Sequence, residues 1–197
     1  MDEKPLIDAA RRGDVGSFNR LVLSYQSMVY NFAYRILGDG DAAADATQDA
    51  FISAFKGIGK FRGGSLKAWL MRIVTNACYD QLRLKQRRPA TSLDALLELD
   101  SAPLRSLTDP GESPEQYAMR QELSRTIQVG MGTLPPEQRV ALILCDVQGL
   151  SYQEIAEVTD ASLGTVKSRL SRARGKMRDF LLEQRELLPS RYRLKNE

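Results

Sequence analysis

Hydrophobic residues recur with the spacing of an α-helix along nearly the whole chain, and no segment shows the alternation typical of a β-strand. The clearest stripe follows i, i+3, i+4, i+7 between residues 15 and 37 and predicts a helix there. Its members are Phe18, Leu21, Val22, Tyr25, Val29, Phe32 and Ile36. Further helices are predicted over 41–56 and from the turn 61–65 to about residue 88, where Pro89 ends the pattern. These segments predict a first small helical bundle.

The helical pattern then stops in a proline-rich, acidic segment. Residues 89–115 hold four prolines and six acidic residues against one basic residue, Arg105. This composition is typical of a linker rather than of a packed element. The sequence therefore predicts an all-α chain of two small helical bundles, with boundaries at 1–88, 89–115 and 116–197.

The second bundle is predicted to end in a helix-turn-helix. A helix over about 115–132 is followed by one that opens at 134 and ends before Gly149. Ser151 and Glu154 have the spacing of a capping box, so a new helix starts there and ends near residue 159. Ser162 is placed to cap the last helix, which runs to about residue 186. A short helix, a tight turn and a longer helix form this motif.

The last helix is strongly basic. Residues 165–178 contain no acidic residue and six basic ones, which are Lys167, Arg169, Arg172, Arg174, Lys176 and Arg178. Like charges at this spacing repel one another, and binding to DNA relieves the repulsion. The alternative is a solvated basic face over an ordinary core helix. A second basic segment, 81–88, would serve equally as a DNA contact or as a partner of its helix dipole.

The composition argues against an enzyme. The chain has no histidine and a net charge of only +3, and it contains neither a phosphate-binding loop nor a cluster of metal ligands. Cys78 and Cys145 lie far apart in apolar helical patterns, so both are predicted to be buried, reduced thiols. There is no signal peptide and no apolar run long enough to span a bilayer. A cytoplasmic protein without catalytic site, cofactor or metal is expected.

Four motifs together resemble one family of proteins. They are DAAADATQDAFISAF (41–55), FRGGSLKAWLMRIVTNACYDQLR (61–83), LPPEQRVALIL (134–144) and LSYQEIAEVTDASLGTVKSRLSRAR (150–174). With them, residues 5–185 resemble the extracytoplasmic-function (ECF) sigma factors, the two-domain initiation subunits of bacterial RNA polymerase. The resemblance implies core RNA polymerase, promoter DNA and an inhibitory anti-sigma factor as partners of a chain that is a monomer when free.

The resemblance also implies roles for particular residues. The polymerase-binding set is Asp45, Gln48 and Asp49, for which a solvated acidic helix face is the alternative. The set for the melted downstream (−10) element is Phe61, Arg62, Ser65, Arg72, Asn76 and Arg83, with Trp69 left to the core and Asp80 structural. The set for the upstream (−35) duplex is Thr165, Lys167, Ser168, Ser171 and Arg172, with Arg169 and Arg174 on phosphates.

Two other classes of function remain open from the residues alone. An autonomous helix-turn-helix regulator would need a dimerisation surface or a receiver domain, and neither a long apolar heptad nor an α/β pattern is present. A nonspecific nucleic-acid adaptor would need only the basic segments. Sequence preference that depends on core polymerase separates these alternatives from a sigma factor.

Overall fold

The computed structural model describes residues 3–87 and 113–184. It separates into two compact units, one built on the helices before residue 88 and the other on the helices after residue 113. Within the described ranges no residue is in a strand, so the predicted all-α class is confirmed. The predicted linker lies outside the described residues except for 113–115, which cap and begin a helix.

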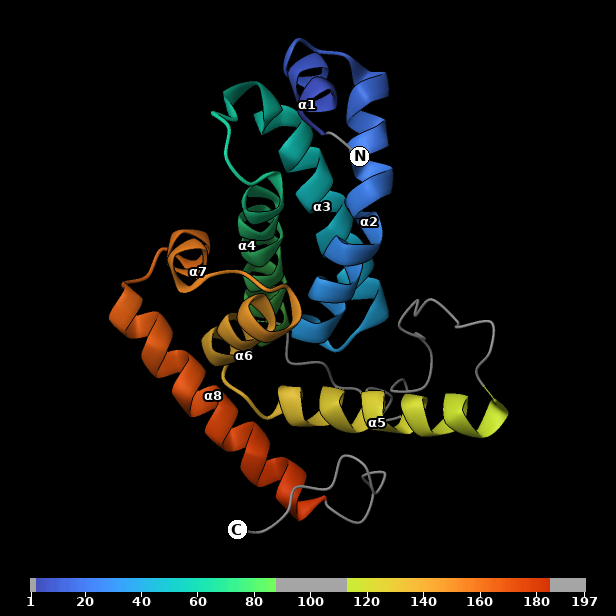
Figure 1. Cartoon of the computed structure of the whole chain (residues 1–197), viewed down its shortest axis with the longest axis vertical. Helices are drawn as coiled ribbons and strands as arrows, with labels where there is room; N and C mark the ends of the chain where they lie inside the picture. The colour runs from blue at the N-terminus through green and yellow to red at the C-terminus, as the bar shows by residue number, and fades with distance from the viewer. Residues whose placement is uncertain (1–2, 88–112, 185–197) are drawn as a thin grey trace. The chain divides into compact units, whose positions relative to one another are not determined.

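The first unit is a bundle of three long helices with a short one across its end (Figure 1). The helices are α1 (Lys4–Arg11), α2 (Val15–Leu37), α3 (Gly40–Gly57) and α4 (Leu66–Arg87), with a 3-10 turn, η1 (Ile58–Lys60), between α3 and α4. Its core includes the fully buried side chains of Val29, Phe32, Ile36, Met71 and Val74. The stripe predicted over 15–37 therefore faces the core.

Local capping explains why α2 has the bounds that the sequence predicted. Asp14 accepts hydrogen bonds from the backbone N–H groups of Gly16 and Ser17 at 3.1 and 3.2 Å, so it satisfies free donors at the start of the helix. Gly38 has a φ of 71°, a left-handed conformation that glycine adopts without strain, and it ends the helix.

Small side chains let α3 lie close to its neighbours. Ala43, Ala46, Ala50 and Ala54 are all buried and form one row along the helix, and α3 packs on both α2 and α4. This row forms the buried side of α3. Because it faces the core, the polar residues of the same helix are left on the opposite, exposed side.

The second unit consists of α5 (Pro114–Gly132), α6 (Pro136–Leu142), α7 (Tyr152–Thr159) and α8 (Leu163–Glu183). Within it, α6 and α5 both pack on α8. At Gly130 of α5 a β-carbon would lie 2.6 Å from Cδ1 of Phe180, so glycine allows this close approach. The buried stripe of α8 consists of Val166, Leu170, Ala173 and Met177.

The helix-turn-helix caps are also confirmed. The Glu154 carboxylate accepts from the Ser151 N–H at 2.8 Å, and the Ser151 hydroxyl accepts from the Glu154 N–H at 3.3 Å. Ser162 accepts from the N–H of Thr165 at 3.1 Å and begins α8. Asp160, with a φ of 49°, makes the turn between α7 and α8. The predicted pair of helices is therefore present with its predicted starts, and α8 ends at Glu183 rather than near residue 186.

One helix differs from the prediction. The segment expected as a single helix from 134 to 148 is α-helical only to Leu142 and continues as a π-helical turn, η4 (Ile143–Val147). Cys145 lies in this turn and is partly exposed, so its predicted burial is wrong. Cys78 is buried as predicted, and burial raises the pKa of its thiol to about 12.

No helix among the described residues is both long and apolar enough to cross a membrane. In the same residues, no three Cys, Asp or Glu side chains are grouped as metal ligands would be.

Candidate DNA and polymerase interfaces

The exposed side of α3 presents a mixed polar and apolar row. Asp45, Gln48 and Asp49 are all exposed, as predicted for a binding face. One turn further on, Ile52 keeps 44% of its surface exposed on the same side of the helix. Sequence reasoning missed Ile52, although its i+3 and i+4 spacing from Asp49 and Gln48 was a usable signal. Ile52 therefore adds an apolar side chain to the exposed polar row of α3.

The turn before α4 combines a buried ring with open backbone. Phe61 is only 6% exposed, and its ring centre lies 5.3 Å from that of Trp69. Gly63 and Gly64 have φ values of 97° and 89°, and no atom within 4 Å would contact a β-carbon there. The turn therefore lets a ligand approach its backbone closely, while Phe61 anchors the turn to the core.

The outer face of α4 holds the other predicted residues for the downstream element. Arg72, Asn76 and Arg83 are exposed and lie on one side of the helix by their i, i+4, i+11 spacing. Arg83 is paired with Asp80 at 2.9 Å, so Asp80 has a structural partner on the same face. Arg72 and Asn76 thus form an exposed polar surface on α4. Arg62, in the turn that precedes α4, is also exposed.

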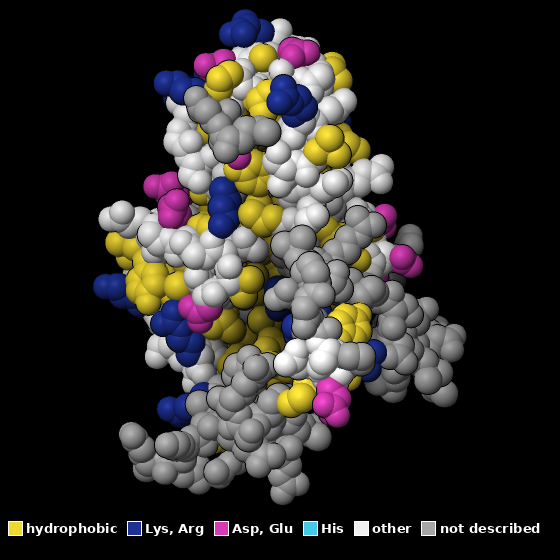
Figure 2. Space-filling model, turned by 45° about the vertical axis from the view of Figure 1, so that its right-hand side comes forward, with side chains coloured by type: hydrophobic (Ala, Val, Ile, Leu, Met, Phe, Trp, Pro, Cys, Tyr) yellow, Lys and Arg dark blue, Asp and Glu magenta, His cyan; other side chains and the backbone are white. Residues whose placement is uncertain are grey.

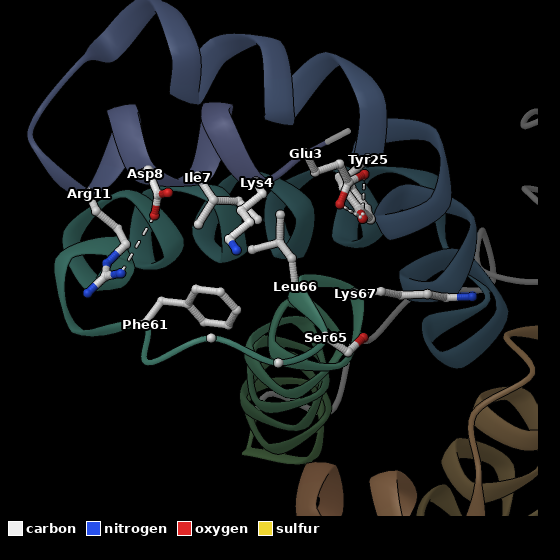
Figure 3. A pocket seen from close by; sticks show the side chains of 12 residues that line it. Glu3, Lys4, Ile7, Asp8, Arg11, Tyr25, Phe61, Ser65, Leu66 and Lys67 are labelled. Carbon is white, nitrogen blue, oxygen red and sulfur yellow. Dashed lines mark hydrogen bonds and ion pairs between the residues drawn. The ribbon is translucent and has the colours of Figure 1, made fainter. Parts of the chain in front are cut away.

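A pocket of about 550 Å³ lies between α1, the 61–65 turn and the first turn of α4 (Figure 3). The Glu3 carboxylate accepts from the Tyr25 hydroxyl at 2.8 and 2.9 Å, and burial with the nearby Glu3 charge raises the pKa of Tyr25. Asp8 and Arg11 pair at 3.8 Å. Basic and acidic side chains also alternate over the α1 end of this unit in Figure 2. The pocket is therefore mixed in charge.

Ser65 has a structural role besides its predicted DNA contact. Its hydroxyl accepts from the N–H of Ala68 at 3.1 Å and caps α4. Ser65→Ala should lower the free energy of unfolding by about 1 kcal/mol, because a helix cap is lost. Ser65→Asp keeps the cap but adds a negative charge, so it should preserve the melting temperature and weaken binding to single-stranded DNA. If both variants bind DNA like the parent, Ser65 is a cap only.

On α8 the predicted residues form an outward face. Lys167, Ser168, Ser171 and Arg172 are exposed, whereas Thr165 and Arg169 are half-buried. The Thr165 hydroxyl is hydrogen-bonded to that of Ser162 at 2.9 Å, and Ser168 donates to the Thr165 carbonyl at 2.9 Å. Lys167 and Arg172 are therefore the two exposed basic residues of the predicted set in the first three turns of α8.

A groove of about 690 Å³ runs along one side of this face. It is lined by Tyr152, Lys167, Leu170, Ser171, Arg174, Gly175 and Arg178. Sequence reasoning did not include Tyr152 or Arg178 in the site. Tyr152 belongs to the preceding helix, and Arg178 lies four residues beyond the last motif, although its i+4 and i+7 spacing from Arg174 and Ser171 placed it on the same side.

The predicted phosphate contact Arg174 already has protein partners. Its Nη2 and Nε donate to the two carboxylate oxygens of Asp146 at 2.6 and 3.1 Å, and Nη2 lies 3.4 Å from the Cys145 sulfur. The hydrogen bond from Arg174 holds the pKa of Asp146 below its usual value. Asp146 thus stays charged, and the pair joins η4 to α8.

Comparison with known proteins identifies the class. The sigma-70 region 2 model matches residues 21–88, and the sigma-70 region 4 model matches residues 124–177. The chain is 38% identical over 178 residues to the RNA polymerase sigma-H factor of Pseudomonas aeruginosa, covering 87% of this chain and 90% of that one. It is 34% identical over 175 residues to the ECF sigma-E factor of Escherichia coli K12, covering 88% of this chain and 91% of that one. The chain belongs to the ECF RNA polymerase sigma factors.

Other relatives agree with this assignment. The ECF sigma factor SigE of Mycolicibacterium smegmatis is 39% identical over 166 residues, which are 84% of this chain and 62% of the relative's length. The fold resembles the sigma factor RpoE of Bartonella quintana, solved with the anti-sigma factor NepR, with a TM-score of 0.63 and 27% sequence identity. The match covers 85% of this chain and 98% of RpoE. The fold also resembles CnrH, solved with the cytosolic domain of CnrY, with a TM-score of 0.62 and 25% sequence identity. The match covers 91% of this chain and 96% of CnrH. The autonomous regulator is therefore not favoured.

Proposed function

We propose that this sigma factor directs core RNA polymerase to promoters by holding two separate DNA segments, one with each unit. The observation that supports this most is the exposed basic face of α8, which lies opposite a fully buried stripe at the end of a capped helix-turn-helix. The first unit, within 1–88, holds the downstream element and the polymerase, and the second, within 116–197, holds the upstream duplex. Residues 89–115 join them.

The upstream element is read as duplex by α8. Lys167 and Arg172 donate to base edges in the major groove, where arginine and lysine pair with guanine, and Ser168 and Ser171 lie between them. Arg169, on the flank of this face, contacts phosphate. The residues that contact bases project from the first three turns of the helix, which is the part a recognition helix inserts into DNA.

The downstream element is held as single-stranded DNA by the 61–65 turn and the outer face of α4. Arg62, Arg72 and Asn76 are exposed there and offer planar or polar groups to unstacked bases, and Arg83 extends the basic surface. Phe61 supports this surface from below, because most of its ring is buried. The chain stabilises the melted strand by binding it and supplies no catalytic group.

An anti-sigma factor is a further partner. RpoE and CnrH were each solved in a complex with another protein, NepR or the cytosolic domain of CnrY, and RpoE's partner is an anti-sigma factor. By this similarity the present chain is held inactive by such a protein in the cytoplasm and is a monomer once released.

Polymerase binding is assigned to Asp45, Gln48, Asp49 and Ile52 on α3. Asp49→Ala and Ile52→Ser should each weaken binding to core polymerase about five- to thirtyfold, which corresponds to about 1–2 kcal/mol from a lost polar contact or lost apolar burial. Both side chains are exposed, so the melting temperature should not change. Leu84→Ser, at an exposed leucine of α4, is the matched control and should bind normally. Equal weakening by Leu84→Ser would contradict the assignment.

The function as a whole is tested by transcription in vitro. Core polymerase from a bacterium, with and without this chain, is supplied with promoter fragments selected by the reconstituted enzyme. Defined run-off transcripts should depend on both components. Transcripts that do not depend on the chain, or sequence preference by the chain alone, would refute the proposal.

A further inference from the structure

Arg174 and Asp146 connect two segments of the second unit, η4 and α8. The Asp146 carboxylate belongs to the π-helical turn η4, and its two oxygens accept from Nη2 and Nε of Arg174 at 2.6 and 3.1 Å. The hydrogen bonds to Asp146 raise the pKa of Arg174. The guanidinium therefore joins the recognition helix to η4, and Tyr152, at the start of α7, lines the same groove as Arg174.

The position of Arg174 on α8 favours a contact within the protein over a contact with DNA. At 3.6 residues per turn, Arg174 lies one turn from Leu170 and Met177 of the buried stripe, at the edge of the outward face. Arg172 projects from the middle of that face. The guanidinium of Arg174 reaches back toward η4, whereas the phosphates of a duplex on α8 would lie outward.

The π-helical turn explains how Asp146 comes to face α8. A π-turn holds more residues per turn than an α-helix, so it rotates the residues after it around the helix axis. The turn begins at Ile143, three residues before Asp146. It forms the C-terminal end of the helical segment that begins at Pro136.

The pair is too exposed to be mainly a source of stability. Its side chains keep 47% and 40% of their surface exposed, and pairs of this kind contribute little to folding. A two-point contact between guanidinium and carboxylate does fix direction, because both groups are planar. Its effect should therefore be on the orientation of α8.

We propose that Asp146 is a positioning residue for recognition of the upstream element, and that it acts by holding Arg174 so that α8 presents Lys167 and Arg172 at the correct angle. Arg174 on this account contributes through its protein contacts and not through a phosphate. The inference rests on the proposed function of α8 and adds a residue outside the basic helix to the specificity of that site.

The test measures binding of the reconstituted holoenzyme to promoter fragments with an intact or an altered upstream element, at several salt concentrations. Asp146→Asn, Arg174→Lys and Arg174→Ala should each reduce discrimination between the fragments by about three- to tenfold. The slope of log affinity against log salt should stay unchanged, since no phosphate contact is lost. Asp146→Asn combined with Arg174→Ala should be no worse than either change alone.

Two results would overturn the inference. If Arg174→Ala lowers the salt slope by about 0.9 while Arg174→Lys and Asp146→Asn discriminate normally, Arg174 is a phosphate contact. If discrimination falls only in proportion to the folded fraction, measured by circular dichroism at the assay temperature, the pair is merely structural. Arg172→Ala serves as the reference. If the parent holoenzyme discriminates between the intact and altered fragments and Arg172→Ala does not, the proposed function of α8 holds, whatever the result for the Asp146 variant. A parent holoenzyme without discrimination would refute the proposed function itself.

Discussion

Arg172→Ala should reduce the preference of the holoenzyme for an intact upstream element by about 5- to 150-fold, because one side-chain contact to a base contributes about 1–3 kcal/mol of discrimination. Arg172 is exposed on the outward face of α8, so its loss should not change the melting temperature. The quantity to measure is the ratio of dissociation constants for the intact and altered fragments, at fixed salt.

Lys176→Ala is the control for this experiment. Lys176 is an exposed cation one turn further along the same helix. Its loss should weaken binding to both fragments equally, with little change in their ratio, as expected of a charge near the DNA backbone. An equal loss of discrimination from both variants would show that α8 acts only by its charge and would contradict base reading by Arg172.

Phe32→Ala should lower the free energy of unfolding of the first unit by about 3–5 kcal/mol, since its ring is fully buried and a cavity would remain. Trp69, the single tryptophan of the chain, lies in the same unit and reports its unfolding by fluorescence. The free energy is obtained from urea denaturation followed at this tryptophan.

Leu23→Ala is the matched control in the same helix. Leu23 keeps 67% of its surface exposed, so the change in free energy should stay within about 0.5 kcal/mol. If the two variants are equally stable, the stripe along α2 is not the core of the unit.

The sequence predicted most of the fold because the local signals agree with the packing. Asp14 and Gly38 mark the ends of α2, and the capping box of Ser151 with Glu154 begins α7, each through contacts within a few residues. The apolar stripe of α2 faces the core as its periodicity predicted. Such features depend on neighbours in the chain, which a single sequence shows.

Other features depend on residues that are far apart. The helix α1 was not predicted, since only Leu6 and Ala10 are buried in its eight residues, too few to establish a period. Arg174 pairs with Asp146, 28 positions away, and Tyr25 with Glu3, 22 positions away. The π-helical turn at 143–147 has no sequence signal comparable to a cap. The contact between Arg174 and Asp146 is the one on which our proposal for Arg174 rests.

The residue roles in the candidate site remain predictions of a different kind. Asp45, Gln48, Asp49, Arg72 and Asn76 have the exposure that binding requires, and family membership indicates what would bind them. Exposure is necessary for such contacts without being specific to them. Ile52 adds an exposed apolar side chain to the α3 face.

The most direct measurement compares the affinity of the purified chain for promoter DNA in the presence and absence of core polymerase, each against a scrambled fragment. We expect strong preference for the promoter only with the polymerase, because each unit alone makes few contacts and the two must be held together to bind both segments. Equal preference without polymerase, or failure to associate with the core enzyme at low salt, would contradict this account.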